Sequence, residues 1–255
     1  MKLIGKNICT SYGSTEILHH LNFSIELGQS VCILGNNGCG KTTLLKTICG
    51  VLPHEGDLFF DDRSVSHWSR RQYAKYFAML PQFSRNYFDY TVEQTVRMGR
   101  YVHDMSDTGI VAEVMAKTGI EDLKDRTLNT LSGGQLQRVL LARTLAQEAP
   151  ILLLDEPMNH LDLKMRSEWL DLLQEWMQGK EEINGRIIPH TLIAVFHDLE
   201  APLTIGDDFL FLKDGCLLAH MAKEQLPETI WSSALGIDIR QYAKQQQQLW
   251  EDLYD

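Results

Sequence analysis

The chain has 255 residues, of which 44% are hydrophobic and 23% charged, so it can bury a sizeable core without disulfide or metal staples. Its formal net charge is −10, which disfavours a nucleic-acid backbone or an anionic membrane surface as a direct partner. The longest apolar runs, such as 151–154 and 209–212, are far shorter than the roughly 20 residues that span a bilayer. Residues 1–14 contain no signal-peptide core, so we expect membrane association only through another protein.

The cysteine pattern points to a reducing cytoplasm. Five cysteines, an odd number, occur without a C-x-x-C pair, which predicts free thiols and neither a disulfide framework nor a zinc site. They are Cys9, Cys32, Cys39, Cys49 and Cys216.

The apolar pattern predicts strands that alternate with helices. Residues 1–33 are predicted to form strands that end in a short apolar run, and the segments "ILLLDEP" (151–157) and "HTLIAVFHD" (190–198) are predicted to be two more buried strands. Between these strands we predict a helix over 42–49, a strand pair in 55–65, mostly helix in 73–149 and a helix over 161–178. After them we predict a hairpin that turns at 214–215 and a C-terminal helix that includes 245–248. Buried apolar strands between helices predict a parallel sheet with helices on both faces.

The stretch "GNNGCGKT" (35–42) matches G-x-x-x-x-G-K-[ST] and lies between a predicted strand and a predicted helix. Glycines let the backbone bring its N–H groups close to phosphate oxygens, and the helix start adds a positive dipole end. Lys41 is expected to reach the β- and γ-phosphates, and the Thr42 hydroxyl to hold Mg²⁺. The candidate nucleotide-binding residues are Gly35, Asn36, Asn37, Gly38, Cys39, Gly40, Lys41, Thr42 and Thr43.

The strand "ILLLDEP" (151–157) supplies an acidic pair at its carboxyl end, the edge at which ligands bind in parallel sheets. We expect Asp155 to bind Mg²⁺ and Glu156 to polarise the attacking water. Alone, such a strand end is also compatible with a helix cap; together with residues 35–42 it predicts a nucleoside triphosphate hydrolysis site.

Six motifs together resemble the ATP-binding subunits of ABC transporters over nearly the whole length. They are "GNNGCGKTT" (35–43), "LPQ" (80–82), "LSGGQLQR" (131–138), "ILLLDEP" (151–157), "NHLD" (159–162) and "VFHD" (195–198). The resemblance implies an α/β fold of the P-loop NTPase type, a RecA-like parallel sheet with flanking helices, plus an antiparallel β subdomain and an inserted helical subdomain. Within the single ABC ATPase domain (1–255), the β subdomain and core would occupy about 1–83 and 150–230, the helical subdomain about 84–149 and a helical tail about 231–255.

The same resemblance implies a role for each motif. Tyr12 would stack on adenine, Gln82 would contact Mg²⁺ and the attacking water, and His197 would hydrogen-bond the γ-phosphate. Asp162 would contact the opposite subunit, although its position also suits the N-cap of helix 163–178. Without the motif, the favoured interpretation of His197 is an ordinary core or strand-end histidine.

The "LSGGQ" motif predicts a homodimer. Ser132 precedes a predicted helix (135–146), and Gly133 and Gly134 permit close approach, so this is a second anion-binding helix start. One chain cannot easily fold both anion sites around one phosphate, whereas two head-to-tail copies can. Ser132, Gly133, Gly134 and Gln135 would then bind the ATP of a second copy.

The segment "TVEQTVRMGR" (91–100) is similar to that of ATPases that serve iron–siderophore, haem and cobalamin importers, and molybdate importers are related. The resemblance implies ATP and Mg²⁺ as cofactors, two permease subunits docking near 83–100, indirectly a periplasmic or surface substrate-binding protein, and a peripheral place at the cytoplasmic face of the inner membrane. The alternative is a soluble ABC-type scaffold ATPase, for example in iron–sulfur assembly, without a permease. Two departures from the family pattern are Met158 after "DEP" and a longer segment 178–191, which we predict to be a charged surface loop.

Overall fold

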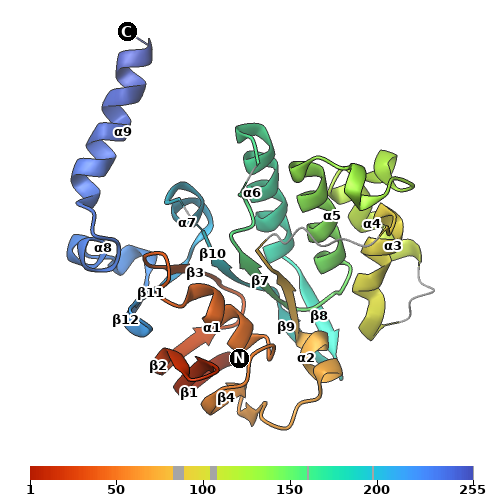
Figure 1. Cartoon of the computed structure of the whole chain (residues 1–255), viewed down its shortest axis with the longest axis horizontal. Coiled ribbons are helices and arrows are strands. Elements are labelled where there is room, and N and C mark those ends of the chain that lie inside the picture. Colours follow the sequence, from red (N-terminus) through yellow and green to blue (C-terminus); the bar gives the residue numbers. More distant parts are fainter. Residues whose placement is uncertain (83–88, 104–107, 160, 197, 255) are drawn as a thin grey trace.

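The computed structural model describes residues 1–82, 89–103, 108–159, 161–196 and 198–254, and its central layer is a six-stranded sheet (Figure 1). The strand order is β12-β11-β3-β10-β7-β6. All neighbours are parallel except the edge strand β12, which pairs antiparallel with β11. The strands are β3 (Ser30–Leu34), β6 (Phe77–Leu80), β7 (Ile151–Asp155), β10 (Thr191–Val195), β11 (Asp208–Lys213) and β12 (Cys216–Ala222). The predicted parallel sheet and the hairpin at Asp214-Gly215 are confirmed.

A separate antiparallel sheet, ordered β2-β1-β4-β5, is formed by the first third of the chain. It consists of β1 (Lys2–Tyr12), β2 (Thr15–Glu26), β4 (Glu55–Phe60) and β5 (Arg63–Ser64). Its apolar positions share a hydrophobic cluster with helix α1 (Lys41–Ile48) and with one face of the central sheet. Alternate residues of β3 belong to different clusters, since Val31 and Ile33 face α1 while Cys32 and Leu34 face the other side.

The remaining helices largely cover the second face of the central sheet. Their apolar residues form one cluster with Cys32, Leu34, Leu152 and Leu154. These helices are α3 (Val92–Arg97), α4 (Thr108–Lys117), α5 (Gly133–Leu145), α6 (Leu163–Met177), α7 (Glu200–Ile205) and α8 (Glu228–Leu235). The α2 helix (Arg70–Tyr76) packs on the opposite face of the sheet. Short 3₁₀ turns occur at Met98–Val102, Glu121–Leu123, Leu128–Thr130 and Lys223–Gln225. The α5 helix therefore lies on the face of the sheet opposite to α1 (Figure 1).

The last helix, α9 (Ile239–Tyr254), projects away from the rest of the molecule (Figure 1). It contains the glutamine run 245–248, as predicted. Among the described residues, no helix has the length and apolar character needed to cross a bilayer.

The predicted charged loop at 178–191 is wrong. These residues form a two-stranded hairpin of β8 (Lys180–Ile183) and β9 (Arg186–Pro189). Asn184 and Gly185 both have positive φ, 53° and 74°, which is the backbone of the tight turn that Asn-Gly favours between strands. Arg186 donates to Asp61 over 3.1 Å and ties the hairpin to the antiparallel sheet.

Candidate nucleotide-binding site

The loop between β3 and α1 has the shape that the 35–42 motif predicts. Gly35 lies so close to β11 that an added Cβ would come within 2.3 Å of the Leu212 carbonyl oxygen, and only glycine fits there. Asn36, Asn37 and Gly38 are exposed, whereas Cys39, Gly40, Lys41 and Thr43 are buried. The α1 helix begins at Lys41 and carries no acidic residue in its first turn, so its positive end is unopposed within the helix.

Lys41 is held inside this loop. Its ammonium donates to the carbonyl oxygens of Gly35, at 2.7 Å, and Asn36, at 3.0 Å. In the part of the chain that the structure describes, the hydrogen-bond partners of this buried ammonium are loop carbonyls. It can exchange them for phosphate oxygens, which are stronger acceptors because they are charged.

Asp155 and Thr42 fit a magnesium ion. The Thr42 hydroxyl donates to Asp155 Oδ1 over 2.9 Å, which joins the start of α1 to the end of β7. Within the described part of the chain, Asp155 Oδ2 is buried and has no hydrogen-bond partner. Burial raises the pKa of Asp155, and the neighbouring charge of Glu156 adds to this effect. A hard dication beside this carboxylate would give Oδ2 a partner and would offset the cost of burying the charge next to Glu156. Mg²⁺ prefers oxygen ligands of this kind.

Glu156 follows Asp155 in a conformation that is rare for glutamate, with φ of 51°. Its Oε2 accepts hydrogen bonds from Gln82 Nε2, at 2.9 Å, and from Asn159 Nδ2, at 2.5 Å. Gln82 follows β6, the neighbour of β7, so the structure brings these two predicted catalytic residues together at one sheet edge. Such local strain is typical of functional sites, where surrounding contacts hold it.

A cleft of about 320 Å³ opens beside the loop and joins it to Glu156. Its lining includes Gly35, Asn36, Asn37, Lys41 and Glu156 on one side. The other side is formed by Phe196, Asp198 and Leu199 and by Leu235, Ile237 and Tyr242 from the C-terminal tail. The contribution of these C-terminal residues to the cleft was not predicted from the sequence, because no local periodicity says where a terminal segment packs. His197 lies outside the described residues.

The "LSGGQ" residues do not line this cleft. Ser132 is the N-cap of α5, and its side chain forms a reciprocal capping box with Gln135. Ser132 and Gly133 are exposed, and a Cβ on Gly133 would meet nothing within 4 Å, so this helix start is open to a ligand or partner. Since α5 and α1 cover opposite faces of the sheet, the two predicted anion sites do not converge within one chain.

Two other predicted residues also lie outside the cleft. Asp162 is the N-cap of α6 and accepts from the Met165 N–H at 2.8 Å, which confirms its capping role. Tyr12 ends β1, is 46% exposed and is not among the described residues that line the cleft, so its stacking role stays a prediction.

A phosphate loop between a parallel strand and a helix, with a buried aspartate beside its threonine, defines a P-loop nucleoside triphosphate-binding protein. The family model described as "ABC transporter" matches residues 18–159. The chain belongs to the ABC transporter family, and this membership implies ATP binding and ATPase activity.

The comparisons also give individual relatives. The petrobactin import ATP-binding protein FpuD of Bacillus anthracis is 34% identical, over 87% of this chain and 81% of the relative. The ferric enterobactin transport ATP-binding protein FepC of Escherichia coli is 34% identical, over 88% and 83% respectively. A dimeric ATP-binding cassette solved in a post-hydrolysis state with ADP and Pi superposes with a TM-score of 0.75 at 26% identity, over 86% of this chain and 98% of that chain. The predicted resemblance to siderophore-type importer ATPases and the fold class are thus confirmed.

Proposed function

We propose that the chain hydrolyses ATP to drive uptake of a chelated metal or similar substrate, of the iron–siderophore, haem, cobalamin or molybdate type, through a transmembrane permease. The proposal is supported by relatives named for petrobactin, enterobactin and achromobactin transport and for cobalamin import. It places the chain peripherally at the cytoplasmic face of the inner membrane, with a substrate-binding protein as an indirect partner.

The observation that carries the mechanism is the separation of the phosphate loop from Ser132 on opposite faces of one sheet. Each site is therefore completed by a second copy, so that Ser132, Gly133, Gly134 and Gln135 of one chain face the loop of the other. Asp162, at the exposed start of α6, contacts the opposite subunit in this arrangement.

The residues around the cleft then have distinct tasks. The loop N–H groups and Lys41 hold the phosphates, and Tyr12 stacks on the base. Thr42, Asp155 and Gln82 hold Mg²⁺, which when bound neutralises charge on the phosphate oxygens. Glu156, oriented by Gln82 and Asn159, accepts the proton of the attacking water, and His197 completes the γ-phosphate contacts.

Docking of the permease is assigned to the segment 83–100, of which the structure describes 89–100. Next to it lies a groove of about 330 Å³ whose lining includes Met79, Met98, Tyr101 and Gln147. Met98 and Tyr101 are exposed, and Tyr101 exposes 70% of its surface, which is the amphipathic anchor that interfaces favour. An amphipathic helix of a membrane protein could bind here by laying its apolar face against Met98 and Tyr101.

The test is purification of the tagged chain from membranes of its own cells, with identification of bound integral proteins. A multi-span permease is expected with the wild type and with Leu218→Asp, but not with Tyr101→Asp. Leu218 is an exposed apolar residue (41%) on β12, at the edge of the central sheet opposite to β6, which carries the groove residue Met79. Recovery with soluble iron–sulfur assembly proteins and no permease would favour the scaffold alternative instead.

A further inference from the structure

The β1–β2 ladder contains three register shifts, and the first two put an extra residue first in β1 and then in β2. Between the pairs Gly5↔Phe23 and Ile8↔Leu21, β1 has one residue more than β2; between Ile8↔Leu21 and Thr10↔Leu18, β2 has one more than β1. The extra residues include Asn7 and His20, both with positive φ, 54° and 51°. Bulges re-aim side chains, and Asn and His tolerate this backbone better than most residues.

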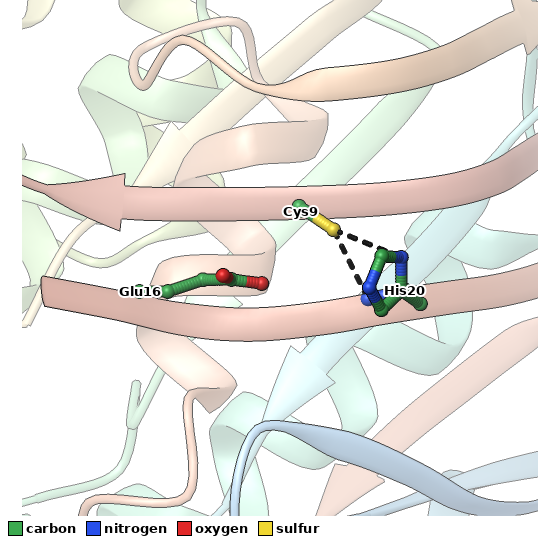
Figure 2. Close-up of side chains that lie close together, drawn as sticks. All are labelled: Cys9, Glu16 and His20. Atoms are coloured by element: carbon green, nitrogen blue, oxygen red, sulfur yellow. Dashed lines mark hydrogen bonds between the residues drawn. The ribbon is translucent and has the colours of Figure 1, made fainter.

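The bulges gather three metal-ligating side chains around one point, although their positions in the sequence follow no ligand motif. Figure 2 shows Cys9 on β1 and Glu16 and His20 on the neighbouring β2. The Cys9 sulfur, one carboxylate oxygen of Glu16 and one ring nitrogen of His20 all lie within 4.8 Å of one another. Cys9 Sγ is 3.4 Å from His20 Nδ1 and also accepts the His20 N–H at 3.2 Å.

These distances suit a tetrahedral ion. Zinc bonds of about 2.3 Å to sulfur and about 2.0 Å to nitrogen separate the two ligand atoms by roughly 3.5 Å, close to the spacing of Cys9 and His20. Glu16 and His20 are exposed, so a small side-chain rotation completes the approach without moving the core. The Asn7 amide oxygen, 2.8 Å from His20 Nδ1, or a water molecule supplies the fourth ligand.

A second layer of contacts already orients the ligands. Glu16 Oε1 lies 3.0 Å from His19 Nδ1, and this hydrogen bond orients the carboxylate. Partners of this kind accompany ligands in metal sites and raise their affinity.

We propose that Cys9, Glu16 and His20 form a binding site for a divalent transition cation of the zinc class. A thiolate with an imidazole and a carboxylate excludes Mg²⁺ and Ca²⁺, which take oxygen ligands, and favours Zn²⁺ or Co²⁺. The site is separate from the magnesium site at Thr42 and Asp155. On binding, the Cys9 thiol gives its proton to solvent. This proposal replaces the expectation, drawn from the absence of a C-x-x-C pair, that the chain has no zinc site.

The proposed ion joins two strands that lead to the nucleotide site. The hairpin tip between Cys9 and Glu16 carries Tyr12. On the other side, His19 N–H donates to the Gly215 carbonyl at 2.9 Å, and Gly215 N–H donates to the Cys39 carbonyl of the phosphate loop at 3.2 Å. The ion therefore fixes the strand pair that carries Tyr12 and that is hydrogen-bonded through Gly215 to the phosphate loop.

The test uses the full chain, reduced, freed of nucleotide and metal, and titrated with Co²⁺ while its absorption spectrum is recorded. We expect one Co²⁺ per chain with a thiolate-to-cobalt charge-transfer band, and its displacement by Zn²⁺. Cys9→Ala should abolish the band, and Glu16→Gln and His20→Asn should weaken binding by about tenfold or more. Asparagine is chosen for position 20 because, like histidine, it tolerates the positive φ of the backbone there.

Matched controls change equivalent residues elsewhere. Cys216→Ala removes an exposed thiol and His67→Asn an exposed imidazole, and both should leave the titration unchanged. Asp155→Asn should leave the thiolate band intact, since an oxygen-ligated site produces none. Absence of the band in the wild type, or its persistence in Cys9→Ala with native circular dichroism, would overturn the proposal; so would equal affinity in His20→Asn.

Discussion

Replacement of Gly35 by alanine should disrupt the phosphate loop more than the same change at Gly38. Both glycines have positive φ, 154° and 80°. At Gly38 a Cβ meets nothing within 4 Å, so Gly38→Ala costs only backbone strain of about 1–2 kcal/mol.

At Gly35 a clash is added to that strain. The Cβ would lie 2.3 Å from the Leu212 carbonyl oxygen and 2.6 Å from Cys39 Sγ, whereas ordinary contacts begin at 3.4 Å. Relief requires the end of β3 to move by about 1 Å from β11, and such overpacking costs a further 1–3 kcal/mol or so. The total is about 2–5 kcal/mol, and the loop N–H groups move with the strand.

Denaturant unfolding and calorimetric titration with ATP measure both effects. Gly35→Ala should lose about 2–5 kcal/mol of unfolding free energy and at least about tenfold in ATP affinity, equivalent to 1.4 kcal/mol. Gly38→Ala should lose about 1–2 kcal/mol of unfolding free energy. Equal stability and equal ATP affinity in the two variants would refute the argument from close approach to β11.

Three further predictions concern the site. Lys41→Ala should reduce ATP affinity by more than about tenfold because a charge-assisted contact is lost, and undiminished affinity by calorimetry would remove Lys41 from the site. Burial raises the pKa of Asp155 in the folded state above its value in the unfolded chain. The contribution of this carboxyl group to the free energy of unfolding is therefore complete only below about pH 3.9 and is lost as the pH rises through the folded-state pKa. Without divalent ions, Asp155→Asn should therefore exceed the wild type in melting temperature at pH 7 and lose this advantage at acid pH; a lower melting temperature at pH 7 would contradict the burial argument. Burial also raises the pKa of Cys39, so iodoacetamide should label exposed Cys216 first and reach Cys39 only slowly; equally fast labelling seen by mass spectrometry would show an open loop.

Local patterns predicted much of the fold because their physical cause is local. The phosphate loop requires its glycines at fixed positions, and the Ser132 cap requires a glutamine three residues on. The hairpin of β8 and β9 also has a local signal, since the turn residues Asn184-Gly185 lie between apolar residues at 183 and 187. The loop prediction was wrong because it followed the charged residues of the segment and not this turn signal.

Long-range features could not be predicted. Tyr242, in the first turn of α9, reaches the cleft because α8 packs against β11 through Trp231, a contact between distant segments that no local spacing encodes. Cys9 lies opposite His20 because of the register shift between Gly5 and Ile8; in the register of Gly5↔Phe23 it would lie opposite His19, and the sequence pattern does not distinguish the two. The division into subdomains and the trans role of Ser132 stay predictions for the same reason, since both depend on contacts beyond one segment or one chain.

The central claim is that the phosphate loop of one copy is completed by Ser132 of another. Glu156→Gln keeps the side-chain shape but removes the proton acceptor, so ATP should remain bound and hold the dimer closed. Light scattering of this variant with ATP and Mg²⁺ should give a dimer, and the double variant with Ser132→Arg should give a monomer that still binds ATP. A monomeric Glu156→Gln variant at saturating ATP would contradict the head-to-tail account.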